Sequence, residues 1–245
     1  MAYIRSFLFG VSFYSLTTVL CFAYLPLLLL PRRGFAPFAR FWVRCSLCFL
    51  RVFNGIDYRI RGQERLPDEP VIFASKHQSA WETLSLAVIM DDPAFVLKKE
   101  LTWIPIFGWY LAKMQNVAVD RSAGAKALKQ MVDQTKERLD EGRPVVIFPQ
   151  GTRTAPGDKS KPYLPGVAAL YGKANVPVVP VALNSGLFWP RRKFLKNPGT
   201  ITLEYLEPIP PGLNRKVFLK ELEGRTEQAT DILVQEERKH LTAEA

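Results

Sequence analysis

The chain begins with a long apolar stretch. The 24 residues from Phe7 to Leu30 include no charged side chain. At about 1.5 Å per residue, a helix of that length spans the ~30 Å hydrocarbon core of a bilayer. The stretch is too long for the core of a signal peptide, and no small-residue cleavage site follows it. The pattern therefore predicts a membrane-associated helix.

A second helix is predicted over residues 35–53, with its charges on one side. Arg40, Arg44 and Arg51 fall within about 60° of one another on a helical wheel, opposite an aromatic and aliphatic face. This pattern is typical of a helix in the membrane interface. Residues 1–55 are thus expected to form a membrane unit, either a spanning helix followed by an interfacial one or a hairpin in one leaflet. Pro26 favours the hairpin, and the charge-free length disfavours two buried helices of a soluble core.

From residue 56 the pattern changes to short apolar runs that alternate with amphipathic segments. The alternation predicts one α/β domain over residues 56–245, a mostly parallel sheet flanked by helices. Pro180 indicates an edge strand or a strand end. The predicted strands are 57–61, 71–74, 94–97, 116–119, 145–148, 176–181 and 199–206, and the predicted helices are 81–90, 103–113, 123–140, 166–174 and 216–240.

The charge of the chain points to an acidic partner. The formal net charge is +10, and residues 1–65 hold nine arginines, no lysine and two acidic residues. Basic charge combined with a strongly apolar segment favours an anionic bilayer surface. No zinc-finger, RRM or KH signature is present, so we expect no nucleic-acid partner.

Several kinds of chemistry are excluded by motif. Cys45 and Cys48 have no second pair and no histidine nearby, so they are expected to pack as small hydrophobes in a reducing compartment. No Gly-x-Ser-x-Gly nucleophile elbow is present. Residues 151–160 fail as a phosphate loop because Asp158 precedes the lysine and the spacing is too long. We expect neither a metal ion nor a cofactor.

The candidate chemistry centres on His77, which follows the apolar run Val71–Ala74 at a predicted strand end. Open α/β sheets place their reactive groups at that edge, and imidazole, with an unperturbed pKa of about 6.5, suits proton transfer. Glu82 is placed to orient the imidazole as its carboxylate partner. Ser79-x-x-Glu82 also matches a helix capping box, so spacing alone leaves both roles of Glu82 open.

Three further segments follow in order: Asn116-Val-Ala-Val-Asp120-Arg121, Phe148-Pro-Gln-Gly-Thr-Arg153 and Val176-Pro-Val-Val-Pro-Val181. Together with His77-x4-Glu82, they make residues 57–206 resemble the glycerolipid acyltransferase family. The N-terminal two-helix unit also resembles the membrane motif of that family. The resemblance implies an enzyme that transfers a fatty acyl group from acyl carrier protein or a coenzyme A thioester to a lysophospholipid hydroxyl. The expected acceptor is 1-acylglycerol-3-phosphate, which gives phosphatidic acid.

The resemblance also implies roles for individual residues. His77 matches the general base, Glu82 the acid that orients it, and Arg153 the arginine that binds the acceptor phosphate. Backbone N–H groups at the Ser79 helix start are candidate oxyanion donors. The other expected substrate-binding residues are Lys98, Arg121, Gln150, Gly151 and Thr152.

This chain departs from the family at two positions. Glu82 stands where the family usually has Asp, and it has one more methylene and more rotamer freedom to lose. Gln150 stands where the family usually has Glu, and it keeps the hydrogen-bonding capacity without the charge.

The resemblance places the enzyme in a bacterial inner membrane with its active site facing the cytoplasm. The basic segment that follows the first helix agrees with a cytoplasmic side. Two alternatives stay open: an acyltransferase acting on another lysolipid such as lyso-ornithine lipid, and a non-catalytic membrane lipid-binding protein. A soluble hydrolase is disfavoured by the apolar N-terminal unit and the missing nucleophile elbow.

Overall fold

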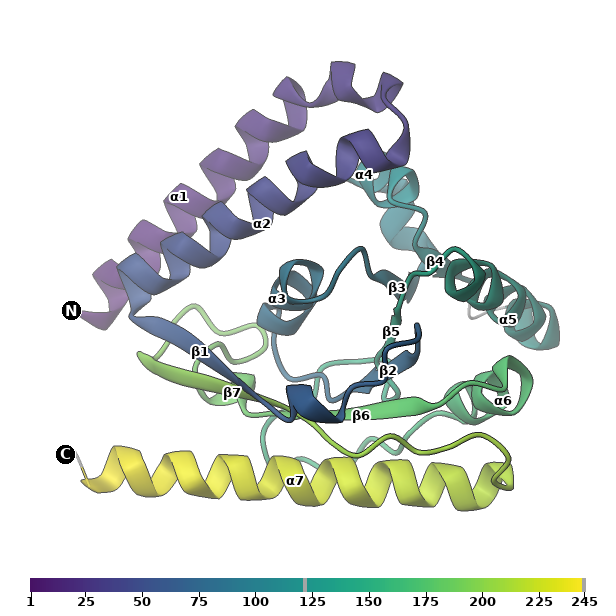
Figure 1. Ribbon diagram of the computed structural model, residues 1–245. Helices are drawn as coiled ribbons and strands as arrows, with labels where there is room; N and C mark the ends of the chain where they lie inside the picture. Colours follow the sequence, from purple (N-terminus) through teal and green to yellow (C-terminus); the bar gives the residue numbers. More distant parts are fainter. Residues whose placement is uncertain (121–122, 244–245) are drawn as a thin grey trace.

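A computed structural model describes residues 1–120 and 123–243 as a seven-stranded sheet with helices on both faces (Figure 1). The strand order is β1-β7-β6-β2-β5-β3-β4. The strands are β1 Ile56–Arg61, β2 Ile72–Ser75, β3 Ala94–Lys98, β4 Val117–Val119, β5 Val145–Ile147, β6 Val178–Leu183 and β7 Gly199–Tyr205. The helices are α1 Ala2–Ala23, α2 Arg32–Asn54, α3 Trp81–Ile89, α4 Phe107–Lys113, α5 Gly124–Asp140, α6 Pro165–Ala174 and α7 Arg215–Ala243.

The sheet is parallel except at one pair of strands. β6 and β7 are antiparallel, and every other neighbouring pair is parallel. The predicted mostly parallel α/β fold is therefore confirmed. Because β2 through β6 run in the same direction, their carboxyl ends meet at one edge of the sheet.

The prediction for Pro180 is wrong. Pro180 lies inside β6, and β6 lies between β7 and β2. The carbonyl of Pro180 accepts a hydrogen bond from the N–H of Leu206, so the proline nitrogen also faces the β7 side. β7 ends at Tyr205. Pro180 has no N–H to donate toward β7, but β7 has already ended at this level. The interior strand therefore accommodates the proline.

Alternating side chains of the strands build two cores, one on each face of the sheet. Ile72 and Val145 pack with buried residues of α5, α6 and α7. Phe73 and Val146 point the other way and pack with Trp81 of α3 and with residues of α1 and α2. Figure 1 shows the resulting layers, with the α1–α2 hairpin and α3 on one side and α7 on the other.

The N-terminal helices form an antiparallel hairpin. α1 is the one helix in the described residues that is long and apolar enough to cross a membrane by length and composition. The predicted helix over residues 7–30 ends at Ala23, because Pro26 lies in the first turn of a 3-10 segment over Leu25–Leu29 and cannot continue the α-helix. Thr17 accepts a hydrogen bond from the Trp42 indole at 2.9 Å, which ties the two helices together.

The arginines of α2 contact acidic residues outside the hairpin. Arg40 pairs with Asp91 at 2.8 Å and Arg51 with Asp57 at 2.9 Å, whereas Arg44 is exposed. Two members of the predicted basic face therefore attach the hairpin to the α/β domain.

The predicted helix over residues 103–113 begins later than expected. Lys99–Trp103 is a 3-10 segment, and α4 starts at Phe107. Pro105 disfavours helical backbone at the residue before it. Ile106 then adopts φ +63° in a tight turn, in which the N–H of Phe107 donates to the carbonyl of Pro105 at 2.7 Å.

Gly62 lies where the chain after β1 approaches the end of β7 closely. It has φ +76°, and a Cβ there would lie 2.1 Å from the carbonyl oxygen of Tyr205. Gly142 has φ +80° but open space around it. We expect Gly142→Ala to cost about 1 kcal/mol and Gly62→Ala more than about 3 kcal/mol of unfolding free energy. Denaturant unfolding in detergent measures both, and equal losses would contradict the close approach.

Candidate active site

Three segments that are far apart in sequence meet at the carboxyl edge of the sheet. His77 follows β2, residues 148–154 follow β5, and residues 184–191 follow β6. The N–H of Thr154 donates to the carbonyl of His77 at 2.8 Å, which joins the first two segments. The sheet topology therefore brings the predicted motifs together.

His77 and Glu82 form a buried pair. Nδ1 of His77 lies 2.8 Å from Oε1 of Glu82, which is fully buried. Because a carboxylate accepts, Nδ1 carries the proton, and the lone pair of the neutral ring stays on Nε2. Nε2 makes no hydrogen bond within the described part of the chain. The Phe148 ring stacks on the imidazole, with centroids 4.0 Å apart, and fixes the plane of the ring.

Glu82 both caps the helix and orients the histidine. Its Oε1 also accepts the N–H groups of Gln78 and Ser79, each at 2.6 Å. Its Oε2 accepts the hydroxyl of Ser185 at 2.8 Å. Four donors thus surround the buried carboxylate and offset the cost of removing it from water.

The same hydrogen bonds narrow the set of expected oxyanion donors. The N–H groups of Gln78 and Ser79 are occupied by Glu82, and the N–H of Trp81 donates to Ser79 Oγ at 3.1 Å. These three amides are therefore engaged within the protein, and an oxyanion role for the remaining amides of the helix start stays a prediction. The extra methylene of Glu82 has a use here, because its side chain reaches back over the first turn of α3 to the amide of Gln78.

Arg153 brings a positive charge to the site. It is half-buried, and its guanidinium makes no hydrogen bond or ion pair within the described residues. Burial lowers the pKa of Arg153, the Glu82 carboxylate raises it, and the Arg191 guanidinium lowers it. Arginine nevertheless stays protonated at neutral pH. The site therefore holds a positive charge close to the His77–Glu82 pair.

The loop after β5 is held by Gln150. Its buried amide donates to the carbonyl of Lys161 at 3.1 Å and accepts the Thr154 hydroxyl at 3.2 Å. Gly151 takes φ +64°, and its N–H closes a turn on the Phe148 carbonyl at 2.9 Å. A neutral side chain suits this internal position. Thr152 is half-exposed beside Arg153.

Of the other two expected binding residues, Lys98 is not drawn into this cluster. Lys98 ends β3, pairs with Glu100 at 2.9 Å, and is separated from β2 by β5. Arg121 lies outside the described residues. Across residues 1–120 and 123–243, no group of three or more His, Cys, Asp or Glu side chains offers a metal site.

Two ion pairs, one buried and one exposed, connect the site to α7. Lys76, 1% exposed, pairs with Glu227 at 2.6 Å. Lys159, in the loop after β5, pairs with Asp231 at 2.7 Å. The long helix therefore fixes the chain on both sides of His77, through the residue before it and through the neighbouring loop.

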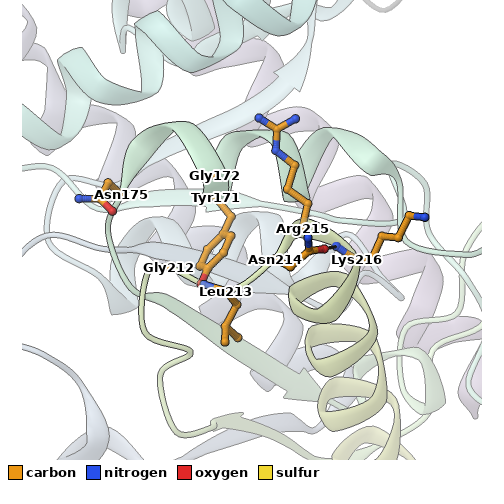
Figure 2. Close-up of a pocket in the computed structure, with 8 residues that line it drawn as sticks. All are labelled: Tyr171, Gly172, Asn175, Gly212, Leu213, Asn214, Arg215 and Lys216. Carbon is orange, nitrogen blue, oxygen red and sulfur yellow. Dashed lines mark hydrogen bonds between the residues drawn. The ribbon is translucent and has the colours of Figure 1, made fainter.

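A wide hollow of about 610 Å³ lies away from this chemistry (Figure 2). It is bordered by the end of α6 and the start of α7, and Tyr171 and Arg215 project toward it in Figure 2. Because α6 leads into the amino end of β6, this hollow lies at the opposite edge of the sheet. A smaller apolar cavity of about 90 Å³ lies between α1, α2 and α4, lined by residues that include Leu20, Phe35 and Tyr110.

Sequence reasoning missed two residues of the site. Ser185 directly follows β6 and therefore shares the carboxyl edge with His77, although only the strand itself was predicted as a motif. Arg191 belongs to the basic run Arg191-Arg192-Lys193, and its Nη1 donates to the carbonyl of Arg153 at 2.8 Å. The sequence signal for Ser185 was its position just after a strand, and the signal for Arg191 was the run of positive charges to which it belongs.

Comparisons with known proteins agree with this geometry. The family model described as Acyltransferase matches residues 57–184, more than half of the 245-residue chain. The chain belongs to the acyltransferase family. It is 44% identical over 160 residues to a 1-acyl-sn-glycerol-3-phosphate acyltransferase of Pseudomonas aeruginosa, covering 65% of this chain and 62% of that protein.

A more distant relative carries the same name. The 1-acyl-sn-glycerol-3-phosphate acyltransferase of Saccharomyces cerevisiae is 27% identical over 173 residues, covering 69% of this chain and 57% of that protein. In both alignments the chain spans less than two thirds of the relative's length. The crystal structure of the PlsC acyltransferase from Thermotoga maritima shares the fold, with a TM-score of 0.75 and 23% identity over 95% of this chain and 98% of that one.

Ser185→Ala tests the fourth donor to the Glu82 carboxylate. Loss of a hydrogen bond to a buried charge is expected to lower kcat of acyl transfer about 10-fold while the protein stays folded. Ser85→Ala is the matched control, because Ser85 is equally buried on α3 and its hydroxyl has no partner. Steady-state rates and circular dichroism check both variants. Equal rates for Ser185→Ala and Ser85→Ala would contradict the role of Ser185.

Proposed function

We propose that this enzyme transfers a fatty acyl group from an acyl thioester to the free hydroxyl of 1-acylglycerol-3-phosphate, giving phosphatidic acid. One observation carries the proposal: the open Nε2 of the His77–Glu82 pair lies in the same site as a half-buried, unpaired Arg153. A base can take the proton of an acceptor hydroxyl, and a cation beside it can bind an acceptor phosphate. The names of the similar proteins support the same acceptor.

In the proposed reaction, His77 acts as the general base. Nε2 takes the hydroxyl proton as the acceptor oxygen attacks the thioester carbonyl carbon. The tetrahedral intermediate collapses with cleavage of the carbon–sulfur bond, and the imidazolium returns the proton to the thiolate. Glu82 stabilises the imidazolium, because its buried carboxylate faces the positive charge at 2.8 Å.

Arg153 is proposed to position the acceptor. Guanidinium binds phosphate oxygens in a bidentate manner, and fixing the phosphate also fixes the hydroxyl relative to Nε2. An acceptor without phosphate leaves this half-buried charge unpaired, which argues for 1-acylglycerol-3-phosphate over lyso-ornithine lipid. Gly151 and Thr152 adjoin the same loop and are proposed to line the phosphate site, and Lys98 to assist from the end of β3.

The α1–α2 hairpin is proposed to hold the enzyme on the bilayer, where the acceptor resides. In the most apolar 18-residue stretch of α1, only 11% is buried inside the structure. Its outward side chains include Phe7, Val11, Tyr14, Val19 and Phe22. An apolar face of this kind, on a chain of net charge +10, fits an anionic leaflet. We place residues 1–55 in the cytoplasmic leaflet of a bacterial inner membrane, with an acidic acyl carrier protein or acyl-coenzyme A as donor.

His77→Ala tests the base and separates the enzyme from a lipid-binding protein. We expect acyl transfer to 1-acylglycerol-3-phosphate to fall by about 10²–10⁴-fold, because proton abstraction is lost. His240→Ala removes the chain's other histidine and is the control. Purified full-length protein is assayed with labelled acyl-acyl carrier protein, acyl-coenzyme A and a panel of lysolipids.

Each result of this assay bears on one alternative. Unchanged transfer by His77→Ala would refute the general base. Turnover by the parent with lyso-ornithine lipid alone would replace the proposed acceptor. No turnover with any donor and acceptor would favour a lipid-binding protein.

A further inference from the structure

We propose that Arg191 is a second cation of the phosphate site, so that the guanidinium groups of Arg191 and Arg153 together bind one phosphate monoester. The assignment rests on the proposed function, because it names the acceptor's phosphate as the occupant. It adds a residue from the segment after β6 to a site otherwise built by the loop after β5.

The first observation is the contact between the two arginines. Nη1 of Arg191 donates to the backbone carbonyl of Arg153 at 2.8 Å, although 38 residues separate them in sequence. The two positive charges are close enough that Arg191 lowers the pKa of Arg153. Two like charges repel each other at this range, and an anion bound by both guanidinium groups would relieve that repulsion.

The second observation is that the protein anion acting on Arg153, the Glu82 carboxylate, is already engaged by other donors. Neither Arg153 nor Arg191 forms an ion pair within the described residues, and the nearby Glu82 carboxylate is occupied by four other donors. Half of the 18 arginines of this chain behave differently. Carboxylates pair with Arg32, Arg40, Arg51, Arg59, Arg61, Arg65, Arg138, Arg143 and Arg225.

The third observation is that the segment carrying Arg191 is held in place. Trp189 packs edge-on against Phe9 of α1, with centroids 5.3 Å apart. The buried Lys196 lies over the same Phe9 ring at 4.9 Å, and its N–H donates to Ser6 at 3.1 Å. Contacts to α1 on both sides of Arg191 thus fix its backbone beside the site, so Arg191 is more than a solvated surface charge.

The chemistry of the pair selects a phosphate monoester. Two planar guanidinium groups offer up to ten N–H donors, and a phosphate monoester offers three charged oxygens to match them. The anchoring helix is the one proposed to lie in the bilayer, so the pair faces a lipid headgroup at the membrane surface. Coenzyme A also carries phosphates, and the experiment has to separate these two sources.

The experiment compares Arg191→Gln with Arg192→Gln. Both remove one exposed positive charge from adjacent positions, so any general attraction to anionic micelles changes equally. Arg192 makes no hydrogen bond or ion pair within the described residues. With 1-acylglycerol-3-phosphate varied in mixed micelles, we expect Arg191→Gln to raise KM for the acceptor about 10-fold or more, with kcat changed less than about 3-fold. Arg192→Gln is expected to stay within about 2-fold of the parent.

Varying the donor identifies the source of the phosphate. KM for acyl-coenzyme A and for acyl-acyl carrier protein is expected to stay unchanged in Arg191→Gln. A rise in KM for acyl-coenzyme A alone would overturn the assignment to the acceptor. A fall in kcat at constant acceptor KM would also overturn it, because Arg191 would then act only by holding the Arg153 backbone.

A direct binding measurement keeps this inference apart from the proposed function. Inorganic phosphate is titrated into the parent and both variants, and binding is followed by the thermal unfolding midpoint. Weaker binding in Arg191→Gln than in Arg192→Gln supports the two-arginine site, even if the parent fails to acylate 1-acylglycerol-3-phosphate. If the parent acylates that lipid while the two variants bind phosphate equally and have equal KM, the proposed function stands and the role of Arg191 is rejected.

Discussion

The buried carboxylate of Glu82 is the interaction on which the site depends. A carboxylate fully removed from water is tolerated only when its oxygens are satisfied. The donors come from the segment after β2, from the start of α3 and, through Ser185, from the end of β6. One charge therefore fixes the tautomer of His77, the beginning of a helix and the position of a neighbouring strand end. Disturbing any of these elements exposes or unpairs the same carboxylate.

The hairpin and the sheet share one core. Phe9 of α1 and Leu50 of α2 are buried in the same cluster as Val181 of β6. Ion pairs from Arg40 and Arg51 add to this packing. The orientation of the active-site edge relative to the outer face of α1 is therefore set by the fold, without a flexible connection.

The sequence predicted the features that depend on local pattern. Apolar alternation predicted the strands, and the position of His77 after one of them correctly placed it at the carboxyl edge of the sheet. Ser185 and Arg191 were missed, because their partners lie 103 and 38 residues away and no periodicity connects them. The late start of α4 follows from Pro105, a local signal that the prediction overlooked, whereas the interior position of Pro180 depends on which segments lie beside β6. A local sequence pattern does not show which distant segments pack beside it.

The ion pairs to α7 have a consequence for biosynthesis. The chain emerges from the ribosome amino end first, so the hairpin and the sheet are made before Glu227 and Asp231 exist. Until then, the ammonium of Lys76 lacks the carboxylate that accompanies its burial, and an unpaired charge resists burial. The chain around His77 can therefore be locked only after the last helix has been made.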